Sequence, residues 1–416
     1  MTNAQGEFLE FIEKSPSVFH AAREVGNFFA ENDYEPINER ERWHLKPEGK
    51  YFTMRDHAAV IAFSLPKNPP KRAIILASHL DSPALKLKPD FISPSEGHSQ
   101  LLTEVYGAPL LTSWLNCDLG IAGRIITDQG FSLVNIDAGA VIPQLAIHLD
   151  REVNEKGLVL NRQDHLKPLI ALDQVDMTEL LRNEVFFREL ISSDLFLYPL
   201  QKPRLLGPNS EMLASYRLDN LSSAYASLYA MTHAKHTSDD TLFISVFWDH
   251  EEIGSKTQGG AESAFLLDAI KRISASYKLD NEGFFILKNS SMCVSIDVTH
   301  AYHPNYPNKH DPHFTPLLGK GVAIKYSSQQ KYTTSAVSAS KFIDVCKQEN
   351  IPFQKYVGRS DLPSGSTVGP PMSAGLGMHT IDIGLPMLSM HSSREIIGMN
   401  DHWDLCKILK AMLERF

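Results

Sequence analysis

The sequence predicts an α/β fold in which helices cover both faces of a mostly parallel sheet, with a β-rich insertion. Runs of apolar residues of strand length, such as 241–248 and 292–297, alternate with helical patterns near both ends of the chain. Strands of a parallel sheet are buried on both faces, so they form nearly continuous apolar runs. Between about 89 and 208 the pattern changes to short, partly alternating segments separated by turn residues. We therefore expect one domain built from residues 1–88 and 209–416, and an inserted domain at 89–208.

The first elements are predicted to be two helices and two strands. Residues 5–32 have a helical pattern that is interrupted at Ser15-Pro16-Ser17, and Ser17 is a good candidate to cap the second helix. Apolar runs at 58–65 and 73–78 predict strands, because a polar, proline-rich turn separates them.

The inserted segment is predicted to contain several short strands, a helix and a loop. The stretch 144–153 (QLAIHLDREV) alternates, so we expect a strand that places His148 on the face opposite the apolar side chains. An acidic stretch at 170–194 is expected to be helical. Residues 198–215, rich in proline and glycine, are expected to form a loop.

After the insertion, helix and strand patterns alternate again. Helices are expected at 220–234, 334–350 and 403–416, and a further strand at 379–384.

Composition narrows the classes of partner. The chain has 416 residues and a net charge of −9, which argues against nucleic acid or an anionic membrane surface as its main partner. No stretch approaches the roughly 20 apolar residues of a membrane span, and no signal peptide is visible. The four cysteines are scattered, as is typical of a reducing compartment. We expect a soluble, cytoplasmic protein.

Histidines and carboxylates gather near the predicted carboxyl ends of strands and at one turn into a helix. In open α/β sheets, ligands bind outside this edge of the sheet. The candidate residues are His79 and Asp81 in ASHLDSP, Asp219 in RLDNLSS, Glu251 and Glu252 in DHEE, Asp297 in SIDVTH, and His391 in MHSSRE.

These residue types favour one or two divalent cations. Several carboxylates in a partly desolvated cleft would repel one another by several kcal/mol unless a cation neutralised them. Imidazole and carboxylate without thiolate are typical of catalytic Zn²⁺, although Mn²⁺ or Co²⁺ would accept the same ligands. One of the adjacent pair Glu251 and Glu252 can then ligate a metal while the other acts as a general base. Asp81 can hold the second ring nitrogen of His79.

Taken together, the segments ASHLDSPALKLKP, RLDNLSS, DHEEIGS, SIDVTHAYHPNY and MHSSRE resemble the M18 metallopeptidases, the aspartyl aminopeptidase family, within the dizinc exopeptidases. The resemblance implies a metal site with one bridging ligand. His79 and Asp297 would bind one zinc, Glu252 and His391 the other, and Asp219 both. It also implies that Glu251 is the general base, that Asp81 orients His79, and that the Asp219–Asn220 peptide is cis.

The resemblance further implies an oligomer and a substrate preference. His148 would reach a neighbouring subunit's active site and help to stabilise the reacting carbonyl, and Lys325 would help to recognise an acidic substrate side chain. The family forms a shell of twelve subunits assembled from dimers, which are made through the inserted domain. We therefore expect a homo-oligomeric aminopeptidase that uses a metal-bridging water and removes an N-terminal residue, preferably Asp or Glu, from peptides with a free N-terminus.

Two alternatives remain open from the sequence. One is a dizinc amidohydrolase that acts on acylated amino acids. The other is a catalytically silent, shell-forming scaffold, which would have no need for Glu251. Each candidate residue taken singly also has an ordinary structural explanation, such as a turn, a helix cap or a polar strand face.

Overall fold

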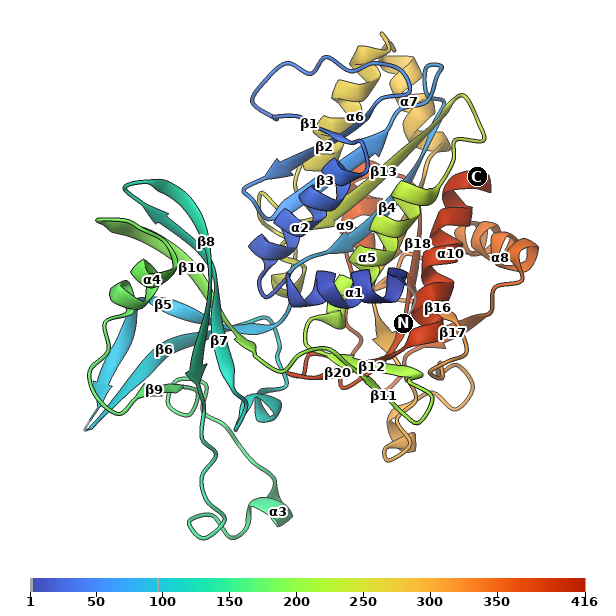
Figure 1. Cartoon of the computed structure of the whole chain (residues 1–416). Helices are drawn as coiled ribbons and strands as arrows, with labels where there is room; N and C mark the ends of the chain where they lie inside the picture. The colour runs from blue at the N-terminus through green and yellow to red at the C-terminus, as the bar shows by residue number, and fades with distance from the viewer. Residues whose placement is uncertain (1–2, 96, 416) are drawn as a thin grey trace.

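The computed structural model describes residues 3–95 and 97–415, arranged around three sheets (Figure 1). The largest sheet has nine strands, and its centre is parallel, because β13, β4, β14 and β18 run in the same direction. Antiparallel partners flank this centre, so the sheet is mixed. In spatial order its strands are β1 (Glu35–Pro36), β2 (Lys50–Arg55), β3 (Ala59–Ser64), β13 (Thr241–Trp248), β4 (Arg72–His79), β14 (Met292–Ile296), β18 (His379–Gly384), β16 (Val322–Tyr326) and β17 (Phe353–Val357).

Helices cover both faces of this sheet, as the sequence predicts. Alternate residues of β4 enter opposite cores: Ile74 and Leu76 face one, Ile75 and Ala77 the other. The first core is closed by α1 (Asn3–Glu13), α2 (Val18–Glu31), α5 (Leu218–His233), α8 (Ala336–Glu349) and α10 (Met399–Arg415). The second is closed by α6 (Phe265–Ser276), α7 (Asn281–Ser290) and α9 (Gly369–Leu376).

A six-stranded antiparallel sheet stands beside this body (Figure 1). Its core includes Trp114 and Ile121, and α4 (Met177–Glu184) packs on it. A long loop that carries α3 (Val153–Lys156) extends away from it. The spatial order is β8 (Gly130–Ala140), β7 (Leu119–Thr127), β10 (Leu190–Pro199), β5 (Ala84–Ser95), β6 (His98–Tyr106) and β9 (Leu169–Ala171).

A small third sheet joins the C-terminal end of the insertion to the C-terminal part of the chain. It pairs β12 with β20, so that Ser215 lies opposite Glu395. Its strands are β11 (Arg204–Leu206), β12 (Met212–Ser215), β20 (Glu395–Gly398), β19 (Pro386–Leu388) and β15 (Thr299–His300). Three short 3₁₀ turns complete the elements: η1 (Leu111–Trp114), η2 (Glu251–Ile253) and η3 (Pro307–Lys309).

Most predicted elements of the main body are present. The Ser17 hydroxyl accepts a hydrogen bond from the His20 amide at 3.5 Å and caps α2, as expected. The four cysteines, all within the described residues, are free thiols. No helix in the described part of the chain has the length and apolar character needed to cross a membrane.

Three predictions for the insertion are wrong. Residues 144–152 form a loop with turns rather than a strand, and Val153 begins α3, so His148 has no strand face to lie on. The stretch 170–194 is helical only over the short α4; it also holds the end of β9 and, from Leu190, the start of β10. The expected loop at 198–215 contains β11 and β12, because distant β20 provides a pairing edge for it.

Candidate metal centre

Three neighbouring strands carry chemical groups to one edge of the large sheet. His79 is the last residue of β4, Asp297 directly follows β14, and η2 with Glu251 and Glu252 follows β13. β4 lies between β13 and β14 and is parallel to both. The carboxyl ends of these strands therefore meet at the same edge, which is why groups about 220 residues apart in the sequence lie together.

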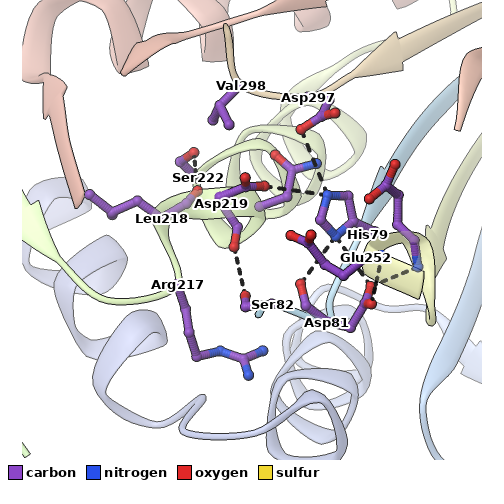
Figure 2. A network of polar contacts seen from close by, with 12 residues as sticks. His79, Asp81, Ser82, Arg217, Leu218, Asp219, Ser222, Glu252, Asp297 and Val298 are labelled. Carbon is purple, nitrogen blue, oxygen red and sulfur yellow. Dashed lines mark hydrogen bonds and ion pairs between the residues drawn. The ribbon is translucent and has the colours of Figure 1, made fainter. Parts of the chain in front are cut away.

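Two further groups come from outside the strands. Asp219 lies in the first turn of α5, where its dihedral angles are not helical and its peptide bond to Asn220 is cis, as expected. His391 follows β19 in the small sheet and has a left-handed backbone, with φ of 64°. Figure 2 shows Asp219 and Asp297 directed at the His79 ring.

Asp219 lies between the two imidazoles and offers a different oxygen to each. His79 Nε2 is 3.4 Å from Asp219 Oδ1 and 3.7 Å from Asp297 Oδ1. His391 Nε2 is 3.3 Å from Asp219 Oδ2 and 3.5 Å from Glu252 Oε2. Each imidazole thus shares Asp219 with the other and has one carboxylate of its own.

The donor atoms fit a metal site. Ligand atoms of His79, Asp219 and Glu252 lie within 4.8 Å of one another. Asp219 Oδ1 and Glu252 Oε1 are buried and find no hydrogen-bond partner among the described residues. A buried carboxylate oxygen without a donor is costly, and a cation would remove that cost.

The carboxylates of the site are buried and close together, so their negative charges repel one another. Burial and the neighbouring Asp219 raise the pKa of Glu252 well above its usual range, and burial is the main cause that raises the pKa of Glu251 to about 8. The hydrogen bond to Asp219 and the nearby Glu252 raise the pKa of His391 to about 10, against the effect of burial. Without metal, the site therefore draws protons to offset its negative charge.

Asp81 lies where the sequence predicts, beside the other side of the His79 ring. Its Oδ1 is 3.3 Å from His79 Nδ1, and its main-chain oxygen is 3.1 Å from the same nitrogen (Figure 2). This contact leaves Nε2 as the nitrogen that faces Asp219 and Asp297.

Glu395 is a site residue that sequence reasoning missed. The residue is only 2% exposed, and its carboxylate accepts hydrogen bonds from the His391 amide at 2.7 Å and from the Asp219 amide at 2.9 Å. Burial and the charge of Asp219 raise its pKa to about 8. The available signal was its place in MHSSRE, four residues after His391.

The candidate ligands line a cavity with a volume of about 580 Å³. Lys325, on β16, lines the same cavity. Its side chain is 3% exposed, and its ammonium donates to the Val298 carbonyl at 2.8 Å and lies 3.7 Å from Asp297 Oδ2. The ring of Tyr332 lies 4.8 Å from it. A buried cation thus lies beside the candidate ligands.

His148 is the one predicted site residue that the single chain keeps apart from the others. It is exposed in the turns of the long loop that follows β8. The residues that line the cavity within the chain do not include it.

An α/β sheet that brings imidazoles and carboxylates together at the edge of one cavity is typical of metal-dependent hydrolases. The family model described as "Aminopeptidase I zinc metalloprotease (M18)" matches residues 11–413. The chain therefore belongs to the M18 family and is a metallo-aminopeptidase, a hydrolase.

Known relatives extend this assignment over nearly the whole chain. A probable M18 family aminopeptidase 2 from Clostridium acetobutylicum is 39% identical, with 95% of each chain covered. Its counterpart in Borreliella burgdorferi is 35% identical and covers 98% of this chain and 97% of its own.

Among solved structures, a chain of the Ape4 and Nbr1 complex has a TM-score of 0.94 at 32% identity, covering 99% of this chain and 85% of its own. The mApe1 dodecamer of S. cerevisiae has a TM-score of 0.85 at 25% identity, covering 99% and 96%.

Proposed function

We propose that the protein is a dizinc aminopeptidase that removes the N-terminal residue from peptides and prefers Asp or Glu at that position. The observation that carries the proposal is the position of Asp219, whose two oxygens face two different imidazoles at 3.4 and 3.3 Å. Each imidazole also has a carboxylate of its own, and this is the donor set that two ions with one bridging ligand require.

The proposed ligands divide into two groups around the bridging Asp219. His79 and Asp297 would hold one zinc, and Glu252 and His391 the other. Bound zinc supplies Lewis acidity and makes a water molecule acidic enough to lose a proton near neutral pH. Mn²⁺ and Co²⁺ would be accepted by the same ligands.

Glu251 is proposed as the general base. It lines the cavity next to Glu252, but of the two it is Glu252 that faces His391, at 3.5 Å, so the Glu251 carboxylate is available for proton transfer. It would take a proton from the attacking water and deliver it to the nitrogen of the leaving amine. Asp81 would hold the His79 ring in the orientation that directs Nε2 into the site.

Lys325 is proposed to favour an acidic residue at the substrate's N-terminus. Its ammonium is buried and lines the cavity. A substrate carboxylate there would meet a cation that is already desolvated, which strengthens their attraction.

Assembly is proposed to complete the site. The loop of His148 exposes Leu145, Ile147 and Leu149, with 57%, 45% and 74% of each residue accessible. Exposed apolar residues of this kind are typical of a surface that another chain covers. We propose a homo-oligomer built from dimers through the inserted sheet, in which His148 enters a neighbour's site, with the dodecamer of the yeast relative as its size. The four free thiols are consistent with the proposed cytoplasmic location.

The decisive experiment is a peptide panel. Release of the N-terminal residue is measured on Asp-, Glu-, Leu-, Ala- and Lys-peptides, after chelation and after addition of zinc, manganese or cobalt. Chelator-sensitive release concentrated on Asp and Glu is the expected result. Release concentrated on Leu or Ala would contradict the acidic preference and keep the mechanism.

An N-blocked version of each peptide separates the alternatives. Cleavage of blocked substrates as fast as free ones would favour an amidohydrolase that acts on acylated amino acids. Bound metal with no cleavage of any substrate would favour a scaffold and overturn the proposal.

A further inference from the structure

The end of β6 carries a segment of the six-stranded sheet to the metal centre. Residues 106–113, YGAPLLTS, run from Tyr106, the last residue of β6, into η1. They contact residues beside His79 and the ring of His391, although they follow a strand of the neighbouring sheet.

The first contact reaches His79 through Asp81. The Tyr106 hydroxyl donates to Asp81 Oδ2 at 2.7 Å, and Asp81 Oδ1 is 3.3 Å from His79 Nδ1. The same carboxylate accepts from the amides of Glu251 and Glu252, each at 3.1 Å. Asp81 thus contacts His79, the turn that carries the two glutamates, and the six-stranded sheet (Figure 2 shows Asp81 beside His79). Tyr106 is the side chain of the sheet that makes this contact.

The second contact reaches His391 through the main chain. His391 Nδ1 lies 3.0 Å from the Ala108 carbonyl, which can only accept, so this nitrogen carries the proton and Nε2 is left to face Asp219 and Glu252. The Leu110 amide donates to the His391 carbonyl at 2.8 Å. These two bonds set both the tautomer and the position of the ring.

Two further contacts hold the same stretch in place. The Ser393 amide donates to the Ser113 hydroxyl at 2.9 Å, and the Ser393 hydroxyl donates to the Ser113 carbonyl at 2.6 Å. Gly107 lies between the two imidazole contacts with φ of +69°. A Cβ there would lie 3.2 Å from Glu252 Cβ and 3.3 Å from the Glu252 carbonyl oxygen. Only glycine allows this approach without displacing the turn that carries Glu252.

We propose that residues 106–110 act as a brace that positions both metal-facing imidazoles, with Tyr106 as its positioning side chain. The affinity for metal would therefore depend on the six-stranded sheet. The inference rests on the proposed function in that His79 and His391 are taken as metal ligands. Groups that orient metal-bound histidines from behind contribute substantially to metal affinity.

The test compares two tyrosines of the same sheet. Tyr106→Phe keeps the ring, which packs against Phe196 at 5.5 Å, and removes only the hydroxyl. The matched control is Tyr198→Phe on β10, which loses a similar hydrogen bond, to Asn135 at 2.6 Å, away from the cavity. Zinc affinity of the full-length variants is measured by competition with a chromophoric chelator. Tyr106→Phe is expected to weaken zinc binding about 10-fold, the lower end of the effect of losing an outer partner of a ligand.

A second pair keeps the test valid if Tyr106→Phe folds poorly. Gly107→Ala places a methyl group against Glu252, whereas Gly139→Ala introduces a similar positive-φ residue, at +55°, with nothing within 4 Å. Only the first is expected to weaken zinc binding. Excess zinc should restore the activity of both brace variants, Tyr106→Phe and Gly107→Ala. If the substitutions had instead damaged the catalytic groups, excess zinc would not restore activity.

Zinc affinities of Tyr106→Phe and Gly107→Ala equal to those of their controls would overturn the brace. The proposed function fails separately. In that case the unmodified protein shows no zinc-dependent release of N-terminal residues, while the difference in zinc affinity between the variants and their controls persists.

Discussion

At the scale of single residues, Glu251 and Glu252 show how adjacent identical side chains receive different environments. Glu252 approaches His391 and joins the close cluster of ligand atoms. Glu251 lines the cavity at the neighbouring position. Both amides donate to Asp81, which holds the short turn η2 that carries the two side chains.

Replacing Glu251 with Gln is expected to lower kcat by roughly 10²- to 10⁴-fold while zinc still binds, because the amide cannot accept a proton. Steady-state kinetics and zinc content measure the two effects. The control is Glu282→Gln, the same change at an exposed position of α7. Full activity of Glu251→Gln would rule out the proposed base.

Replacing Lys325 with Met is expected to reduce kcat/KM for Asp-peptides relative to Leu-peptides by about 10- to 100-fold, the value of one charge-assisted hydrogen bond. The ratio is measured at saturating zinc, since the ammonium also lies 3.7 Å from Asp297. Lys355→Met, an exposed lysine on adjacent β17, provides the control. An unchanged ratio would remove Lys325 from substrate selection.

At the scale of elements, strongly periodic helices and buried strands agree with their sequence patterns. α5, α8, β13 and β18 lie within two residues of the predicted bounds. The loop at 144–153 does not, because its alternating apolar residues are exposed rather than packed on a core. Alternating apolar and polar residues indicate that one side of a segment is apolar. They do not indicate whether that side faces the protein's own core or another molecule.

A buried histidine between α1 and α10 gives an element-scale prediction. His402 on α10 is fully buried and stacks on Phe8 at 3.9 Å, and burial lowers its pKa to about 3. The unfolded chain protonates this ring below about pH 6.5, whereas the folded protein leaves it neutral until about pH 3. Its neutral packing therefore stabilises the fold above pH 6.5, and this contribution is lost as the pH falls from 6.5 to 3.

Replacing His402 with Phe keeps a stacked ring and removes the titration. Between about pH 6 and 4, lowering the pH should reduce the free energy of unfolding less in the variant than in the unmodified protein. The two slopes should differ by about 1.4 kcal/mol per pH unit. Pulse proteolysis of both proteins in urea with the metal chelated gives the two slopes. Parallel slopes would show that His402 is already charged in the folded state.

At the scale of the whole molecule, the six-stranded sheet is connected to two regions that bear on function. The end of β6 and the residues after it bring Tyr106 and Ala108 to the metal centre. A loop of the same sheet exposes His148 with its apolar neighbours. A sheet that contacts its own site and offers a surface to another chain would connect assembly to activity.

Mixing two inactive variants tests whether His148 acts between subunits. Chains with His148→Ala retain Glu251, and chains with Glu251→Gln retain His148. In randomly mixed dimers, half are mixed and each holds one complete site, so about a quarter of full activity should return on co-expression. Activity that stays at the level of the separate variants would show that His148 does not complete a neighbour's site.

The sequence by itself determined the α/β class and the family, and it predicts the insertion and the candidate ligands, because local hydrophobic periodicity and short motifs are carried by neighbouring residues. The tertiary structure decided which residues support the candidate ligands. Glu395 reaches Asp219 across 176 positions of the chain, and Ala108 reaches His391 across 283, while Tyr106 reaches Asp81 from the neighbouring sheet. No local pattern encodes such a contact, since it depends on how strands β4, β13 and β14 align at one edge and on where β6 ends beside them.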